Sequence, residues 1–115
     1  MDITSILQRA LQLNASDIFF IAGLPLTYKV SGRQRREGEP LKPEDTRALV
    51  EDIYALCGRN PERVAAEDAD DDFSFAIREM GRFRANVLHQ RGSLAVVLRV
   101  IRFGLPDPEA LGILP

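Results

Sequence analysis

The sequence predicts an α+β domain in which helices pack on one face of a mostly antiparallel β-sheet, and three observations lead to this fold class. The chain has 115 residues, which is room for one domain. Its helical and strand-like segments follow one another in blocks, without the strict alternation that builds a parallel sheet. The two longest strand-like segments are separated by two residues, a connection typical of antiparallel hairpins.

The first part of the chain predicts one helix followed by short strands. Apolar residues recur at helical spacing over residues 3–14, with Asp2 and Thr4 as candidate N-caps and Asn14 as a candidate left-handed residue at the helix end. The segments that follow are rich in β-branched and aromatic residues or alternate in polarity, which predicts strands. These strands are expected over residues 16–22, 26–31 and part of 33–40.

The second part predicts a long helix, a charged loop and three strands. Pro43 and the two acids after it suit the first turn of a helix, and Gly58 ends its apolar pattern. A short helical piece is expected over residues 60–68, and a charged loop over residues 70–72. Strands are expected from Phe73 onward, over residues 81–90 and over residues 93–102.

Charge is distributed unevenly behind a formal net charge of −2. Residues 44–72 contain ten acidic residues and three arginines, whereas residues 78–102 contain six arginines and one acidic residue. Arginine's planar fork suits bidentate contacts with phosphate or carboxylate groups. The arginine cluster therefore indicates an anion site, and the alternative is a solvated sheet face paired with the acidic segment.

A two-residue turn at Arg91 and Gly92 determines which residues lie opposite each other in the predicted hairpin. One face is apolar and consists of Phe83, Ala85, Val87, Val96, Leu98 and Val100. The other face holds Arg82, Arg84, Asn86, Gln90 and Arg99. Arg84 is expected directly opposite Arg99, and like charges in this arrangement destabilise a sheet unless something neutralises them. The register therefore favours an anion at these arginines, with carboxylates of the same domain as the alternative.

The residues present disfavour several other kinds of site. The chain contains no Gly-x-x-x-x-Gly-Lys-Ser/Thr phosphate loop and no Gly-x-Gly-x-x-Gly motif, so this chain alone is not expected to be an enzyme. Its single cysteine, Cys57, excludes a disulfide and is expected to be a small buried apolar residue. His89 has no nucleophile nearby in the sequence, and no metal site is expected. The chain has no apolar run of roughly 20 residues and no signal pattern, which predicts a cytoplasmic protein.

Several short motifs together resemble the PilT-type pilus retraction ATPases. They occur in the family's order over nearly the whole chain, as Asn14-Ala15-Ser16-Asp17-Ile18, Ala22-Gly23-Leu24-Pro25, Asp72-Phe73-Ser74-Phe75, Gly81-Arg82-Phe83-Arg84-Ala85-Asn86, Gln90-Arg91-Gly92-Ser93 and Leu98-Arg99-Val100-Ile101. The chain departs from the family at Phe19, where His is usual, and at Ser31, where Asp or Asn is common. The resemblance implies that residues 1–103 form a PAS-like N-terminal domain and that residues 104–115 begin the linker to an ATPase core domain.

The resemblance also implies a function for the arginines. In the family this domain covers the nucleotide held by the core domain and packs on the core domain of the neighbouring subunit in a homohexamer. Arg84, Arg91 and Arg99, together with Arg82, are then expected to contact the nucleotide phosphates. ATP and Mg²⁺ are expected in the full-length protein and neither for this chain alone. The implied location is the inner face of the cell membrane, reached through the pilus machinery, with the pilus platform protein as an indirect partner.

The sequence also bears on the type of motor and leaves two alternative functions to consider. A start at Met1 favours the retraction type, because assembly and secretion ATPases usually carry an additional N-terminal region. A free-standing PAS-like sensor or interaction module is the main alternative. Nucleic-acid binding by the arginine face is a weaker one, because the chain is acidic overall and few aromatic residues stand among the arginines.

Overall fold

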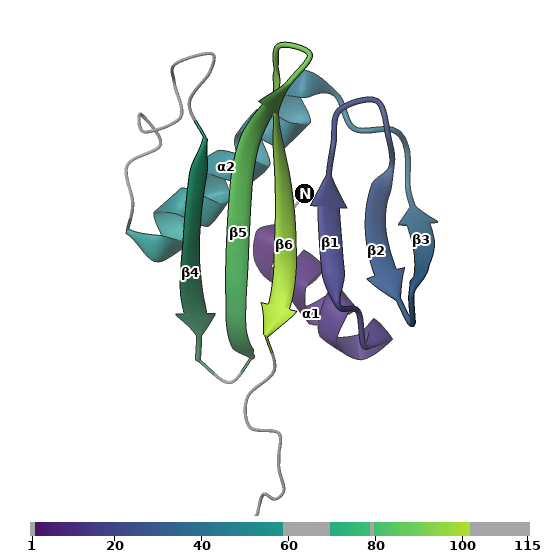
Figure 1. Cartoon of the computed structure of the whole chain (residues 1–115), viewed down its shortest axis with the longest axis vertical. Helices are drawn as coiled ribbons and strands as arrows, with labels where there is room; N and C mark the ends of the chain where they lie inside the picture. Colours follow the sequence, from purple (N-terminus) through teal and green to yellow (C-terminus); the bar gives the residue numbers. More distant parts are fainter. Residues whose placement is uncertain (1, 59–69, 79, 102–115) are drawn as a thin grey trace, which may run out of the picture.

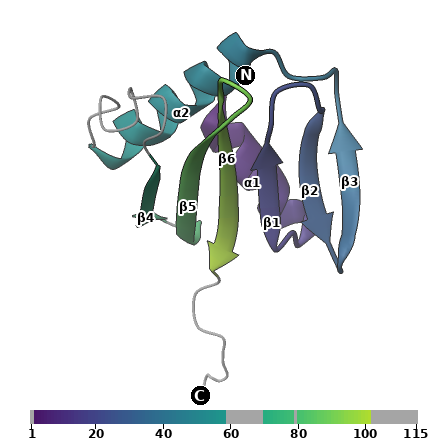
Figure 2. The ribbon, with the colours of Figure 1, turned by 45° about the horizontal axis from the view of Figure 1, so that its top comes forward.

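The computed structural model describes residues 2–58, 70–78 and 80–101, which form one six-stranded sheet and two helices. Along the chain the elements are α1 (Ile3–Leu13), β1 (Asp17–Phe20), β2 (Leu26–Val30), β3 (Arg33–Glu37), α2 (Pro43–Cys57), β4 (Asp71–Ile77), β5 (Gly81–Gln90) and β6 (Ser93–Ile101). The strand order is β3-β2-β1-β6-β5-β4, and every neighbouring pair is antiparallel. Both helices lie on the same side of the sheet (Figure 1 and Figure 2). The predicted α+β class is therefore confirmed.

Helix α1 forms where the sequence predicts it, because its two ends carry residues suited to capping. The Asp2 carboxylate accepts a hydrogen bond from the Thr4 backbone N–H at 3.3 Å, which satisfies one of the free donors of the first turn. Asn14 adopts φ 62° and ψ 38°, the left-handed conformation that ends a helix. The buried face of α1 consists of Ile3, Ile6, Leu7 and Ala10.

Helix α2 begins and ends as its sequence indicates. Pro43 occupies the first turn, where its missing N–H costs nothing. The Asp45 carboxylate accepts a hydrogen bond from the Lys42 backbone N–H at 2.8 Å, and its charge suits the positive end of the helix dipole. Gly58 ends the helix with φ 69°, a conformation that favours glycine. The buried face of α2 consists of Thr46, Leu49, Val50, Ile53 and Tyr54.

The hydrophobic core fills the layer between the helices and the sheet. Its largest fully buried side chains come from both helices and from the central strands: Leu7, Ile18, Phe20, Tyr28, Leu49, Ile53, Tyr54, Phe83 and Leu98. Each such side chain stabilises the fold by roughly 1.5–3 kcal/mol relative to an exposed one. Because the core takes only one face of the sheet, α1 and α2 leave the other face uncovered, and we call that the open face.

The structure corrects the predicted charged loop at residues 70–72. Asp71 and Asp72 belong to β4, where they pair with Val87 and Asn86 of β5. The ladder extends this far because both side chains find partners: Asp71 accepts a hydrogen bond from the Tyr54 hydroxyl at 2.8 Å, and Asp72 pairs with Arg84.

The first strand is also shorter than predicted, running from Asp17 to Phe20 rather than over residues 16–22. The expected helical piece over residues 60–68 and the expected linker over residues 104–115 lie outside the described residues.

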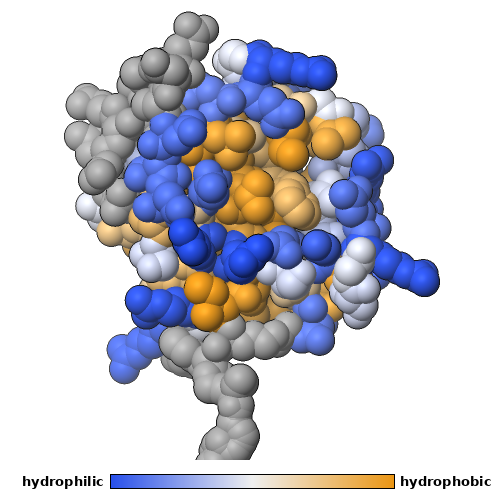
Figure 3. All heavy atoms as spheres, viewed as in Figure 1, coloured by the Kyte–Doolittle hydropathy of each residue, from blue (hydrophilic) through white to orange (hydrophobic). Residues whose placement is uncertain are grey.

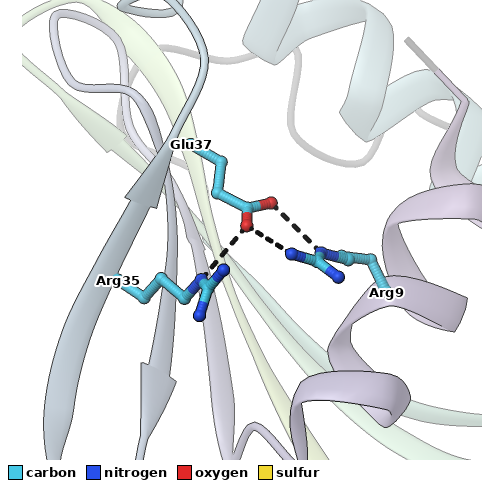
Figure 4. Close-up of polar contacts among 3 residues, drawn as sticks. All are labelled: Arg9, Arg35 and Glu37. Carbon is cyan, nitrogen blue, oxygen red and sulfur yellow. Dashed lines mark hydrogen bonds and ion pairs between the residues drawn. The ribbon is translucent and has the colours of Figure 1, made fainter.

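An ion-pair cluster joins α1 to the edge strand β3. The Arg9 guanidinium donates two hydrogen bonds to the Glu37 carboxylate, at 2.9 and 3.4 Å, and Arg35 donates a third at 3.2 Å (Figure 4). These donors hold the pKa of the Glu37 carboxyl below its ordinary value, Arg9 contributing more than Arg35. The cluster fixes the edge of the sheet against the helix.

Candidate functional site

The predicted register of the β5–β6 hairpin is confirmed, and it brings two of the candidate arginines together. Arg84 pairs directly with Arg99, and Arg82 pairs with Ile101. All three arginines are exposed on the open face of the sheet. The residues predicted for the apolar face of the hairpin lie on the opposite side: Phe83, Ala85, Val87, Val96 and Leu98 are buried, and Val100 is half-buried against the core.

Two carboxylates flank this arginine pair and complete a row across four strands. Asp17 of β1 pairs with Arg99 of β6, and Asp72 of β4 lies beside Arg84 of β5. The open face therefore carries the charges minus, plus, plus, minus in the order β1, β6, β5, β4. The row lines a hollow of about 300 Å³ together with Asn86, Leu88 and Val97. Each arginine therefore has an acidic neighbour, which offsets the repulsion expected between the like-charged Arg84 and Arg99.

The two arginines are held differently. Arg84 donates hydrogen bonds from Nε and Nη2 to the two carboxylate oxygens of Asp72, at 3.0 and 2.8 Å. The hydrogen bond from Arg84 lowers the pKa of the Asp72 carboxyl, and Asp72 raises the pKa of the guanidinium. Arg99 makes a looser ion pair, with its Nε 3.5 Å from Asp17 Oδ1. Its side chain remains 72% exposed, against 60% for Arg84.

The structure places Arg91 apart from the other three arginines. Arg91 lies in the β5–β6 turn with φ 54°, and the following Gly92 has φ 79°. It lines a second hollow, of about 340 Å³, between this turn and the β1–β2 connection around Leu24. The open-face pair and Arg91 are therefore at different places on the molecule, and only a ligand or partner that spans both would contact all of them.

Sequence reasoning missed the two carboxylates and the apolar residues beside them. Asp72 was expected in a loop, and Asp17 reaches Arg99 through the pairing of β1 with β6, which no local pattern reveals. Phe19, Leu88 and Val97 are half-buried on the open face although no helix covers them. Figure 3 shows this apolar area surrounded by hydrophilic residues. Exposed apolar patches with a polar border are typical of interaction surfaces.

Other potential sites are absent from the part of the chain that the structure describes. None of the helices in it is both long and apolar enough to cross a membrane. Within the same residues, no three side chains of His, Cys, Asp or Glu are grouped so that they could hold a metal ion. Cys57 is half-buried rather than fully buried, and it packs against the core from the end of α2.

Comparisons with known proteins agree with the fold and with the motifs. The type IV pilus ATPase PilU of Pseudomonas aeruginosa is 33% identical over 112 residues, which are 96% of this chain and 28% of PilU. The type IV pilus retraction ATPase PilT of the same organism is 34% identical over 113 residues, which are 97% of this chain and 32% of PilT. No protein-family profile matches the chain.

Solved structures give the same result. The crystal structure of the pilus retraction motor PilT with bound ADP superposes with a TM-score of 0.73 and 36% identity, covering 100% of this chain and 33% of that one. The Legionella pneumophila ATPase DotB, at 24% identity and a TM-score of 0.62, shares the fold. The chain is an α+β domain of the kind found in the pilus retraction motor PilT. It matches the N-terminal domain of the PilT-type ATPases and spans about a third of the length of these relatives.

Proposed function

We propose that this domain covers the nucleotide of a hexameric pilus motor ATPase and couples its subunits, with arginines of the open face contacting the nucleotide phosphates. ATP and Mg²⁺ would be held by a core domain outside this chain, in a cytoplasmic protein that acts at the inner face of the cell membrane. Retraction is the direction that we propose for the motor, because both curated relatives are type IV pilus ATPases and one is named for retraction.

The observation that carries this proposal is the exposed pair Arg84 and Arg99. The two arginines are cross-strand neighbours on β5 and β6, and both line a hollow on the face of the sheet away from the hydrophobic core. Phosphoryl transfer shifts negative charge in the transition state, and an arginine brought from a neighbouring element is worth roughly 10³–10⁵ in rate. An arginine carried on a mobile cover makes hydrolysis depend on closure of that cover, which couples the chemistry to movement.

The apolar area of the open face supports the coupling part of the proposal. Phe19, Leu88 and Val97 are neighbours of the charged row and are partly accessible to solvent. Burial of such residues against another domain gains free energy from the hydrophobic effect, while the charged row around them gives orientation. A core domain of the same or the neighbouring subunit is the partner that we propose for this face.

The first test is the complete gene. We expect the reading frame to continue past Pro115 into a Walker-type phosphate loop. A native stop codon at that point would contradict the proposal and would favour a free-standing PAS-like module. In that module a small ligand is expected between sheet and helices, where this domain already holds large side chains such as Phe20 and Phe83.

The second test is kinetic and uses the complete ATPase. We expect Arg84→Ala and Arg99→Ala each to lower kcat at least about tenfold, because each removes a positive charge from the transition state. Arg84→Lys and Arg99→Lys should restore little, since an ammonium group cannot reproduce the bidentate fork. Steady-state ATP hydrolysis measures the effect, and size-exclusion chromatography checks that the assembly survives.

Arg36→Ala is the matched control, because Arg36 is also exposed on the open face but lies on the edge strand β3. It removes the same charge at a distance from the pair and should leave kcat within about twofold. If Arg84→Ala and Arg99→Ala both hydrolyse ATP at the parental rate, the arginines serve only to balance Asp72 and Asp17.

A further inference from the structure

Arg84 already donates hydrogen bonds to Asp72, and these limit how a ligand can bind its guanidinium. Its Nε and Nη2 form one of the two guanidinium edges that can donate to two oxygens of a phosphate or carboxylate. Asp72 already occupies that edge with both of its oxygens, at 3.0 and 2.8 Å. The second edge, formed by Nη1 and the other N–H of Nη2, is left outside this pair.

Arg99 differs, although it lies directly opposite on the neighbouring strand. Its acidic neighbour Asp17 is buried, with a side chain only 12% exposed, and accepts a hydrogen bond from the Ser16 hydroxyl at 2.8 Å. The contact from Arg99 Nε to Asp17 is 3.5 Å, longer than a charge-assisted hydrogen bond. Asp17 therefore holds Arg99 less tightly than Asp72 holds the Nε–Nη2 edge of Arg84.

We propose that Asp72 is a built-in competitor for the anion that this arginine pair binds, and that it must release the Nε–Nη2 edge of Arg84 before that edge can hold a phosphate group. The inference rests on the proposed function, because it takes the anion to be the phosphate chain of a nucleotide. Asp72 stands in for that anion when the site is empty and keeps the like charges of Arg84 and Arg99 compatible with the sheet.

The exchange is possible because the Asp72–Arg84 pair lies on the surface. The two side chains are 46% and 60% exposed, so water replaces Asp72's lost hydrogen bonds when the pair opens. Exposed ion pairs are weak, and a multiply charged phosphate chain can contact both guanidinium groups, whereas the Asp72 carboxylate contacts only that of Arg84. Asp17 does not have this freedom because it is buried in the β1–β6 pairing.

The test uses this chain with inorganic tripolyphosphate as the probe. NMR titration of the arginine Nε–H signals reports the dissociation constant at Arg84 and Arg99. We expect Asp72→Asn to bind tripolyphosphate about two- to fivefold more tightly than the parent, the range that an exposed ion pair supports. Asp72→Thr, which removes the carboxylate but favours a strand, should behave in the same way.

Asp52→Asn is the matched control. Asp52 is exposed on α2, on the opposite side of the sheet from the open face, and its replacement changes the net charge by the same amount as Asp72→Asn. Its affinity should stay at the parental value. The double variant Asp72→Asn/Arg84→Ala should lose the gain, because the benefit of removing Asp72 acts through Arg84. Equal or weaker binding by both Asp72 variants, an equal gain in Asp52→Asn, or no saturable shift at Arg84 would each overturn the inference.

The same variants separate this inference from the proposed function. If Asp72→Asn tightens tripolyphosphate binding while Arg84→Ala leaves ATP hydrolysis by the complete protein unchanged, Asp72 is a competitor at an anion site that is not used in catalysis. If Arg84→Ala slows hydrolysis but Asp72→Asn does not tighten binding, the arginine role stands and Asp72 is overturned as a competitor.

Discussion

At the scale of single residues, Tyr28 shows how position in the core changes a titration. Its ring lies on the helix side of β2 with 1% of its surface exposed. The pKa of the Tyr28 hydroxyl is raised from an ordinary value of 10.0 to about 12, mainly by burial and secondly by the nearby Glu37 carboxylate, while Arg9 partly opposes the shift. The folded state therefore favours the neutral phenol of Tyr28 over its phenolate.

This shift predicts a loss of stability in alkaline solution. Because the pKa is higher in the folded than in the unfolded chain, its contribution is complete below pH 10.0 and is lost as the pH rises towards about 12. Tyr28→Phe keeps the ring and removes the titrating group, so its free energy of unfolding should fall less over that interval. Urea unfolding of both proteins at several pH values measures the difference, and parallel curves would contradict the prediction.

At the scale of elements, the β5–β6 hairpin combines a structural and a proposed functional role in one turn. Arg91 and Gly92 both have positive φ, at 54° and 79°, which defines the turn type that suits the twist of antiparallel strands. Glycine adopts this conformation freely, whereas arginine is strained by its Cβ. The turn that joins β2 to β3, at Ser31 and Gly32, has the same pattern with φ 52° and 78°.

The strain at Arg91 predicts that Arg91→Asn stabilises the domain, because asparagine tolerates the left-handed conformation. We expect a gain of a few tenths of a kcal/mol to about 1 kcal/mol in the free energy of unfolding. Ser31→Asn, in the equivalent turn, should give a similar gain without removing an arginine. Chemical denaturation measures both, and a destabilised Arg91→Asn variant would show that the arginine side chain contributes contacts worth more than the strain.

At the scale of the whole molecule, the arrangement in two layers decides what can be bound. Both helices and the core occupy one face of the sheet, so the open face carries the charged row and the apolar area beside it (Figure 1 and Figure 3). Neither hollow described above is enclosed by a phosphate loop, since the sequence contains none. A nucleotide on this surface would be held by side chains from one side only.

We therefore predict that the 115-residue chain alone hydrolyses no ATP and binds it with a dissociation constant above about 1 mM. A few arginine–phosphate contacts without a backbone cradle do not offset the freedom that the ligand loses on binding. Isothermal titration calorimetry and a phosphate-release assay test the two parts. A micromolar affinity would show that this domain forms a nucleotide site by itself.

Among the described residues, the amino-acid sequence alone determined most of the elements and the hairpin register. Capping residues such as Asp2 and Asn14 marked the ends of α1, and the two-residue turn at Arg91 and Gly92 placed Arg84 opposite Arg99. These features are local, because caps, turns and side-chain alternation depend on residues a few positions apart. The arginine face was predictable for the same reason.

Only the tertiary structure decided which carboxylates meet these arginines. Asp17 reaches Arg99 because β1 pairs with β6, and Asp72 reaches Arg84 because β4 continues beyond the predicted strand. The contact of Asp17 depends on strands that are distant in the sequence and are brought together by burial of a shared core face. The contact of Asp72 joins the consecutive strands β4 and β5 and depends on how far β4 extends. The sequence pattern indicated neither the β1–β6 pairing nor the full length of β4, so the acidic partners of the arginines, and with them the competition that we propose at Arg84, appear only in the folded chain.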